Sequence, residues 1–209
     1  MIRLLGKLPT EGFYVCVSGG IDSMTLAHFL LGSKRKFTAL YFNHGTEHGE
    51  LAQGFVEEQM EKLGVPLIKG KIDSKQVNSS KSMEENWRNA RYAFFKRYAV
   101  TGPILMAHHL DDVIETYIMT SLKGKPRTIP YRNQKYNIIR PFLITQRCDI
   151  EDWAENHDVE YVKDPSNDNT RFDRNYVRHK MMPMVKRINP GIATTVKKIV
   201  LEKYEEDIL

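Results

Sequence analysis

The 209-residue chain contains two cysteines, Cys16 and Cys148, and no Cys-x-x-Cys pair. This scarcity makes a structural disulfide improbable and argues against zinc knuckles, iron–sulfur clusters and a relay of paired thiols. No apolar run approaches the ~20 residues that a membrane-spanning helix needs. The apolar stretch before Pro9 is also too short for a signal peptide. We therefore expect a cytoplasmic protein that contacts no membrane.

A second absence is a lysine in the loop that follows the apolar run 13–17. A Walker-type phosphate loop would need that lysine to bridge the outer phosphates of a nucleotide. The loop consists of Ser18, Gly19, Gly20, Ile21, Asp22 and Ser23, and an apolar helical pattern follows it. Adjacent glycines let the backbone turn its amides toward one point, and the start of the helix points its free amides there too.

Asp22 gives this loop its chemical character. A carboxylate beside phosphates makes sense chiefly as a magnesium ligand. The loop is therefore predicted to bind a nucleotide whose pyrophosphate leaves as a unit. An ordinary glycine turn between strand and helix is the alternative.

Size and composition are those of one globular domain with a full core. Hydrophobic residues make up 41% and charged residues 27% of the chain. The net charge of +5 and the isoelectric point near 9.1 favour a polyanionic partner only weakly, because many proteins are this basic.

Apolar, β-rich runs alternate with helical patterns. The expected strands are 13–17, 37–42, 65–69 and 104–107, and the expected helices between them are 21–31, 48–63 and 83–100. This order predicts an α/β fold with a doubly wound, mostly parallel sheet flanked by helices. The first, second and fourth strands are followed by Ser18, by Asn43 and His44, and by His108 and His109. These polar clusters should therefore lie at one edge of the sheet.

The second half of the chain is less regular. Residues 121–136 read as a long basic loop, followed by a helix near 146–157, a turn at 164–168, a basic helix from about Asn175 and an amphipathic helix from about Gly191. We expect a catalytic domain over 1–188 and a C-terminal helix over 189–209. Val196, Ile199, Val200 and Tyr204 form a stripe that could cap the core, form a homodimer, or be what remains of a second domain.

The clearest acidic cluster follows the histidine pair. Asp111, Asp112 and Glu115 fall on one face of a helix, since residues three and four apart are neighbours. Such a cluster can hold magnesium, bind an ammonium group or accept a proton from an attacking amine. A solvated acidic helix face is the alternative. For His108 and His109, hydrogen bonding or acid–base chemistry is favoured over zinc binding, and a structural role is open for either.

Two basic clusters are candidate phosphate contacts. Arg88 and Arg91 lie one helical turn apart. A turn containing Asn167 leads into a helix that carries Arg174 and Arg178, where basic residues oppose the helix dipole. Phosphate binding would account for them, and ordinary solvated charge is the alternative.

Together these residues resemble one family. Ser18–Ser23 is similar to the PP-loop of the ATP pyrophosphatases. With 43–45, 86–92, 108–116, 140–141 and 164–183, it follows the order and rough spacing of the tRNA(Ile)-lysidine synthases, over about residues 12–190. The resemblance implies that magnesium-ATP adenylates the C2 oxygen of wobble cytidine 34 in an isoleucine tRNA with a CAU anticodon. Free L-lysine then displaces AMP through its side-chain amine.

The resemblance also implies roles for particular residues. The loop would bind pyrophosphate, with Asp22 on Mg²⁺. His109 and Asp112 would lie beside the nucleotide and the reacting base, while Asp111 and Glu115 would hold or deprotonate lysine. The remaining residues would contact ATP or the tRNA: Asn43, His44, Arg88, Arg91, His108, Asn167, Arg174 and Arg178.

Two departures from the family pattern concern substrate contacts. Thr46 and Glu47 stand where the family usually has a leucine and an arginine. The family also continues into further tRNA-binding domains, whereas this chain stops at Leu209. Other readings are a PP-loop tRNA thiolase or amidating enzyme, and a non-enzymatic RNA-binding module. Missing cysteine pairs count against the thiolase, and the module would have no use for Asp22 or Asp112.

Overall fold

The sheet is doubly wound and mostly parallel. The computed structural model describes residues 1–73, 75 and 77–204. Within them, six strands pair in the order β3-β2-β1-β4-β6-β5, and only β5 runs antiparallel to its neighbour. The strands are β1 (Phe13–Cys16), β2 (Phe37–Asn43), β3 (Leu67–Lys71), β4 (Ile104–Leu105), β5 (Arg132–Asn133) and β6 (Ile138–Ile139). The predicted fold class is confirmed.

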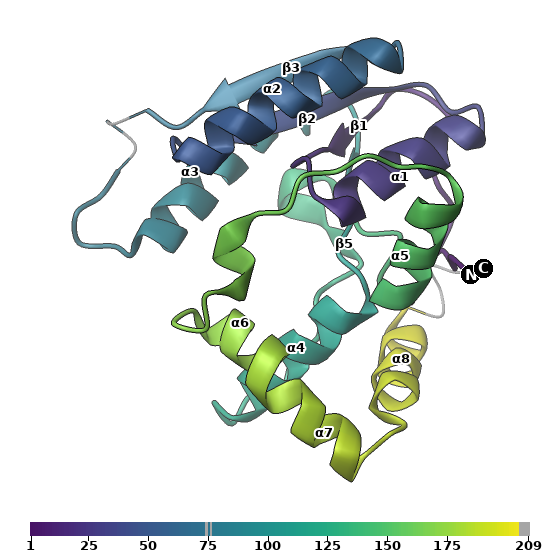
Figure 1. Ribbon diagram of the computed structural model, residues 1–209, viewed down its shortest axis with the longest axis vertical. Helices are drawn as coiled ribbons and strands as arrows, with labels where there is room; N and C mark the ends of the chain where they lie inside the picture. The colour runs from purple at the N-terminus through teal and green to yellow at the C-terminus, as the bar shows by residue number, and fades with distance from the viewer. Residues whose placement is uncertain (74, 76, 205–209) are drawn as a thin grey trace.

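Helices cover both faces of this sheet because successive strand residues point to opposite sides (Figure 1). On one face, Val15 and Ala39 join the core formed with α1 (Ile21–Gly32) and α2 (Glu47–Lys62). On the other face, Leu40 packs in a second cluster with aromatic residues of α3 (Met83–Tyr98). Both clusters are built from the apolar runs that the sequence offers.

The second half of the chain supplies the remaining helices. They are α4 (Leu110–Ser121), α5 (Arg147–Asn156), α6 (Asp173–Tyr176), a π-helical turn η4 (Val177–Met181), α7 (Met182–Ile188) and α8 (Ile192–Lys203), with 3₁₀ turns η2 (Gln134–Tyr136) and η3 (Pro165–Asp168). Helices α4, α6, α7 and α8 gather at the lower end of Figure 1. Val196 and Val200 of α8 are fully buried in the main core, so the predicted stripe caps that core.

Four predicted boundaries differ from the structure. Residues 121–136 are not one loop, because Arg132 and Asn133 pair with β6 as a two-residue edge strand. The third strand starts at Leu67 instead of Val65, whose amide donates to the Met60 carbonyl and closes the end of α2. The fourth strand is only Ile104–Leu105, and the basic helix begins at Asp173 with a π turn inside it. Strands this short carry too few residues for an alternating pattern to mark them.

The order of strands fixes the position of a crevice. β1 lies between β2 and β4, so the chain leaves the carboxyl ends of β1 and β4 in opposite directions along the sheet. Ligands of open α/β sheets bind at this switch point. Loop 18–23 follows β1 and the histidine pair follows β4, as expected. No helix of the described residues is both long and apolar enough to cross a membrane.

Candidate active site

The loop after β1 is a preformed turn held by its two serines. The Ser18 amide donates to Ser23 Oγ at 3.0 Å, and Ser23 Oγ donates to the Gly20 carbonyl at 2.9 Å. Gly20 caps α1 without a side-chain hydrogen bond to the first turn. The first amides of α1 are therefore left for an anion, as the sequence predicts.

Gly19 joins this loop to a distant segment. Its φ of +83° is one that side-chain-bearing residues rarely adopt, and its carbonyl accepts the Val162 amide at 2.9 Å. A Cβ at this position would lie 3.0 Å from Val162 Cγ2. The loop and the segment around Val162 are thus fitted against each other.

We expect Gly19→Ala to destabilise the protein more than Gly64→Ala. Both positions have positive φ, which costs about 1–2 kcal/mol for a residue with a Cβ. Only at Gly19 does the added carbon meet a neighbour, because nothing lies within 4 Å at Gly64. Urea denaturation of the two variants measures the difference. Equal losses would show that the contact with Val162 is unimportant.

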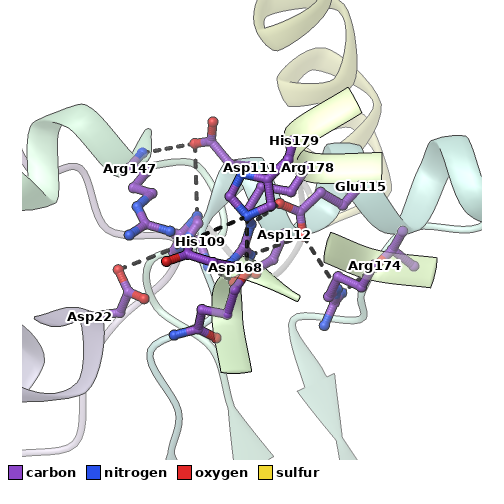
Figure 2. Close-up of polar contacts among 12 residues, drawn as sticks. Asp22, His109, Asp111, Asp112, Glu115, Arg147, Asp168, Arg174, Arg178 and His179 are labelled. Atoms are coloured by element: carbon purple, nitrogen blue, oxygen red, sulfur yellow. Dashed lines mark hydrogen bonds and ion pairs between the residues drawn. The ribbon is translucent and has the colours of Figure 1, made fainter. Parts of the chain in front are cut away.

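His109 links Asp22 to the acidic turn of α4. Its Nε2 lies 3.6 Å from Asp22 Oδ1 and 3.5 Å from Asp112 Oδ2, and the side chain is 1% exposed (Figure 2). The His109 amide also donates to Asp112 Oδ2 at 3.0 Å, which caps the start of α4. The carboxylates of Asp22 in α1 and Asp112 in α4 therefore both lie beside the buried imidazole of His109.

Glu115 lies one turn further along α4 and binds two arginines. Arg178 Nε donates to Glu115 Oε1 at 2.6 Å, and Arg174 Nε lies 3.3 Å from Oε2. Arg178 also reaches Asp112 Oδ1 at 3.4 Å (Figure 2). Arg174 of α6 and Arg178 of η4, whose charges oppose the helix dipole, are therefore paired with buried carboxylates.

The environment moves the carboxyl groups in different directions. Burial raises the pKa of Asp22. Burial also acts to raise the pKa of Asp112, but His109, His108 and Arg174 outweigh it and lower that pKa to about 2. For Glu115 burial raises the pKa, against the opposing hydrogen bond from Arg178. Asp112 is therefore the carboxylate most firmly held in its charged form.

A cavity of about 1130 Å³ opens beside this network. It is larger than a drug-sized pocket and has room for a nucleotide and a second reactant. Twelve of the predicted site residues line it: Ser18, Gly20, Ile21, Asp22, Ser23, His44, Arg91, His108, Asp112, Asn167, Arg174 and Arg178.

Six predicted residues do not line the cavity: Gly19, Asn43, Arg88, His109, Asp111 and Glu115. Asn43 is fully buried, and its Oδ1 accepts the Gly45 amide at 2.7 Å, so it shapes the turn after β2. Asp111 accepts the backbone amide of Arg147 at 2.8 Å. Arg88 is exposed, with its guanidinium 5.4 Å from the Tyr92 ring. These residues support the cavity or lie outside it.

Two parts of the cavity wall have no local sequence signal. Arg147, the first residue of α5, lines it beside Asp22. Another wall is formed by residues 158–159 and 161–164, of which only residue 164 lies in a predicted element, the turn 164–168. Arg147 stands alone between apolar and polar residues, so no local pattern marks it. Its position depends on how α5 packs against α1.

The residues present fit a magnesium nucleotide. Among the described residues, no group of three or more His, Cys, Asp or Glu side chains could hold a metal ion by itself. Asp22 Oδ1 and Arg91 Nε are buried and have no hydrogen-bond partner in the described part of the chain. Mg²⁺ is commonly held by one or two carboxylates together with substrate phosphates, which is the arrangement that Asp22 allows.

Two histidines of the cavity make stability depend on pH. Burial lowers the pKa of His108 to about 3, and burial with nearby Arg91 lowers that of His44 to about 4. The unfolded chain, with histidine pKa values near ~6.5, therefore binds more protons than the folded protein below that pH. Stability should fall as the pH drops from about 6.5 toward 4.

His108→Gln should reduce the slope of the unfolding free energy against pH, because it removes one of the two titrating histidines. One histidine contributes at most about 1.4 kcal/mol per pH unit to that slope. Urea unfolding at several pH values measures both slopes. A variant slope equal to that of the unaltered protein would contradict the assignment.

The sequence matches a known family. The family model described as "PP-loop domain" matches residues 1–185. The chain belongs to the PP-loop domain family. Proteins named tRNA(Ile)-lysidine synthase are among its relatives, and the one from Thermotoga maritima is 35% identical over 202 residues, covering 91% of this chain. The "Bifunctional protein TilS/HprT" of Listeria monocytogenes is 33% identical over 208 residues and covers 92% of this chain.

The chain spans about half the length of the Thermotoga relative, 49%, and 32% of the Listeria protein. Among solved structures, the U34-tRNA thiolase NcsA from Methanococcus maripaludis with its [4Fe-4S] cluster aligns with a TM-score of 0.73 at 16% identity, covering 96% of this chain and 75% of that one. The NMN synthetase of Francisella tularensis aligns with a TM-score of 0.58 at 15% identity, covering 95% and 87%. At these identities the two structures support the PP-loop fold alone.

Proposed function

We propose that the protein is a tRNA(Ile)-lysidine synthase: an ATP-dependent ligase that joins the side-chain amine of L-lysine to C2 of cytidine 34. The observation that carries this proposal is the placement of Asp22 across His109 from Asp112. The phosphate loop and an ionised carboxylate thereby lie at one cavity. The names of the relatives point to the same activity.

In the first step the cytidine C2 oxygen attacks the α-phosphorus of ATP, forming a P–O bond while pyrophosphate leaves. The amides at the start of α1 and the hydroxyl of Ser18 bind the departing phosphates. Mg²⁺, held by Asp22, would neutralise their charge. Arg91 lines the cavity, and its buried Nε has no hydrogen-bond partner among the described residues, so we assign it to nucleotide binding.

In the second step the lysine nitrogen attacks C2 and AMP leaves with the former C2 oxygen. The ammonium group must first lose a proton, which passes to water in the open cavity. We assign its binding to Asp112, which lines the cavity in its charged form. Asp111 and Glu115 do not line the cavity, so we assign them the positioning of Arg147 and Arg178.

The wider assignments follow from this proposal. A tRNA-modifying enzyme of this kind would work in the cytoplasm on an isoleucine tRNA with a CAU anticodon. We retain the division of the chain near residue 188 as part of the proposal. We do not extend it to a homodimer, because Val196 and Val200 of the stripe are buried within the chain.

Thiolation is the neighbouring chemistry to weigh, since the NcsA structure holds a [4Fe-4S] cluster. Protein-bound clusters of that type are ordinarily held by several cysteine thiolates. This chain has only Cys16, in β1, and Cys148, exposed on α5. The cysteines present therefore favour lysine over sulfur as the second substrate.

The test is incubation of the 209-residue protein with ATP, Mg²⁺, L-lysine and an unmodified tRNA transcript carrying a CAU anticodon. We expect pyrophosphate release only when RNA is present, and a nucleoside whose mass corresponds to cytidine joined to lysine with loss of water. A transcript with a GAU anticodon is the matched control. RNA-independent release, or an unchanged nucleoside, would contradict the proposal.

A further inference from the structure

Charge is distributed very unevenly along this chain. Residues 116–148 and 174–201 contain no aspartate or glutamate, yet together they hold 14 of the 31 lysines and arginines. The rest of the chain therefore has 17 basic residues against all 26 acidic ones, a net charge of −9. The overall charge of +5 conceals a strongly basic part and an acidic part.

The fold brings these two acid-free runs together. The first contains the second half of α4 and the turn after it, and the second contains η4, α7 and most of α8. Arg174 of the second run donates to Thr116 Oγ1 of the first at 2.8 Å, and Val196 and Val200 lie in the same core as residues of α4. These elements lie at the lower end of Figure 1, away from α2 and β3. The two runs thus form one basic lobe.

The basic lobe exposes charge that the protein does not neutralise. Six exposed side chains, Lys123, Lys125, Arg127, Lys180, Lys186 and Arg187, form no ion pair with any described residue. By contrast, four lysines outside the lobe each pair with a glutamate: Lys62, Lys69, Lys71 and Lys81. Basic residues are favourable near the C-terminal end of a helix, which explains part of the basic charge in the turn after α4. It does not explain Lys180, which lies within η4.

We propose that the basic lobe is an RNA-docking surface that binds the sugar–phosphate backbone beside the modified nucleotide. This proposal rests on the proposed function and specifies where the tRNA binds on the protein. Arg174 and Arg178 belong to the second run and also line the cavity, where they pair with Glu115 and Asp112, so one stretch of chain connects the exposed basic side chains to the reaction site. A flexible polyanion can follow that path, whereas a planar membrane surface cannot enter the cavity.

The turn after α4 is ordered enough to present its charges in a fixed position. Thr120 Oγ1 accepts the Arg127 amide at 2.8 Å, and the Lys125 amide donates to the Thr120 carbonyl at 3.1 Å. The exposed side chains of Lys123 and Lys125 form no hydrogen bond or ion pair with the described residues, so glutamine can replace them without breaking a polar contact of the fold. Lys34 and Lys36 are an exposed pair with the same spacing outside the lobe, and they provide a control of equal charge loss.

The experiment measures binding of the unmodified CAU transcript to the 209-residue protein over a range of salt concentrations. Lys123→Gln/Lys125→Gln should weaken binding about 10-fold near 0.1 M salt and lower the slope of log K against log salt by about 1 to 2. Lys186→Gln/Arg187→Gln, in the second run, should act in the same direction. Lys34→Gln/Lys36→Gln should stay within about twofold of the unaltered protein.

The proposed docking surface would be refuted if the Lys34/Lys36 control variant weakened RNA binding as much as the lobe variants, or if neither lobe variant weakened it. Preferential binding of the protein to phosphatidylglycerol–phosphatidylcholine vesicles over the transcript would also refute it. The modification assay separates this result from the proposed function. Normal lysidine formation with unchanged RNA affinity in both lobe variants refutes the surface alone. RNA binding that depends on the lobe, with no lysidine formed, refutes the proposed function alone.

Discussion

Replacement of Asp22 by asparagine should lower the rate of RNA-dependent pyrophosphate release by at least about 100-fold. Asp22 Oδ1 is buried, has no hydrogen-bond partner among the described residues and lies at the start of α1 beside the phosphate loop. Asparagine keeps the shape of the side chain but removes the charge that would bind Mg²⁺. Single-turnover measurement of pyrophosphate at saturating ATP and transcript gives the rate.

Asp158→Asn is the matched control for this prediction. Asp158 also lines the cavity, and its φ of +50° is one that asparagine tolerates. It is exposed, and its side chain forms no hydrogen bond or ion pair with the described residues of the loop, so its loss should change the rate less than about threefold. Equal rates for the Asp22 variant and the unaltered protein would remove Asp22 from the reaction, provided that circular dichroism shows both to be folded.

Glu115→Gln should cost stability as well as activity. Glu115 is 2% exposed and pairs with Arg174 and Arg178, so its neutralisation removes a buried counter-charge from both guanidinium groups and leaves Arg178 only its 3.4 Å contact with Asp112. Removing one partner of a buried ion pair typically costs about 3–5 kcal/mol. Arg178 should also lose its fixed position at the cavity, which we expect to raise the KM for tRNA. Urea unfolding and steady-state kinetics measure the two effects.

Glu58→Gln separates this effect from the loss of any ion pair. Glu58 and Lys62 form an exposed pair one helical turn apart, with side chains 62% and 54% exposed. Such a pair contributes about 0–1 kcal/mol. If Glu115→Gln and Glu58→Gln lose equally little stability, the ion pairs of Glu115 with Arg174 and Arg178 do not stabilise the fold as the distances indicate.

The parts of the site that could be predicted from sequence are those with a local cause. Ser18–Ser23 is recognisable because a strand, two glycines and a helix start are contiguous, and the contacts of Ser23 bear out the turn. The acidic turn at Asp111 and Asp112 is likewise contiguous with the strand before it. Parallel topology then brings both to one edge, since the carboxyl ends of β1 and β4 are adjacent.

The remaining features depend on tertiary packing that no local pattern records. Glu115 was expected to face lysine, but α6 and η4 place Arg174 and Arg178 against it across more than fifty residues of sequence. Arg147 reaches the cavity only because α5 packs beside α1. Strand β5 forms because its two residues pair with β6; its sequence shows no alternation of apolar and polar residues that would predict a strand. Side-chain pairing between distant segments therefore decided which predicted residues line the cavity.

The central claim is that a nucleotide triphosphate binds on loop 18–23 with Asp22 beside it. A crystal structure of the protein with a non-hydrolysable ATP analogue and Mg²⁺ tests it most directly. We predict phosphate oxygens within hydrogen-bond distance of the amides at the start of α1, and the metal ion bound to Asp22. An analogue bound elsewhere, with loop 18–23 and Asp22 free of it, would contradict the account.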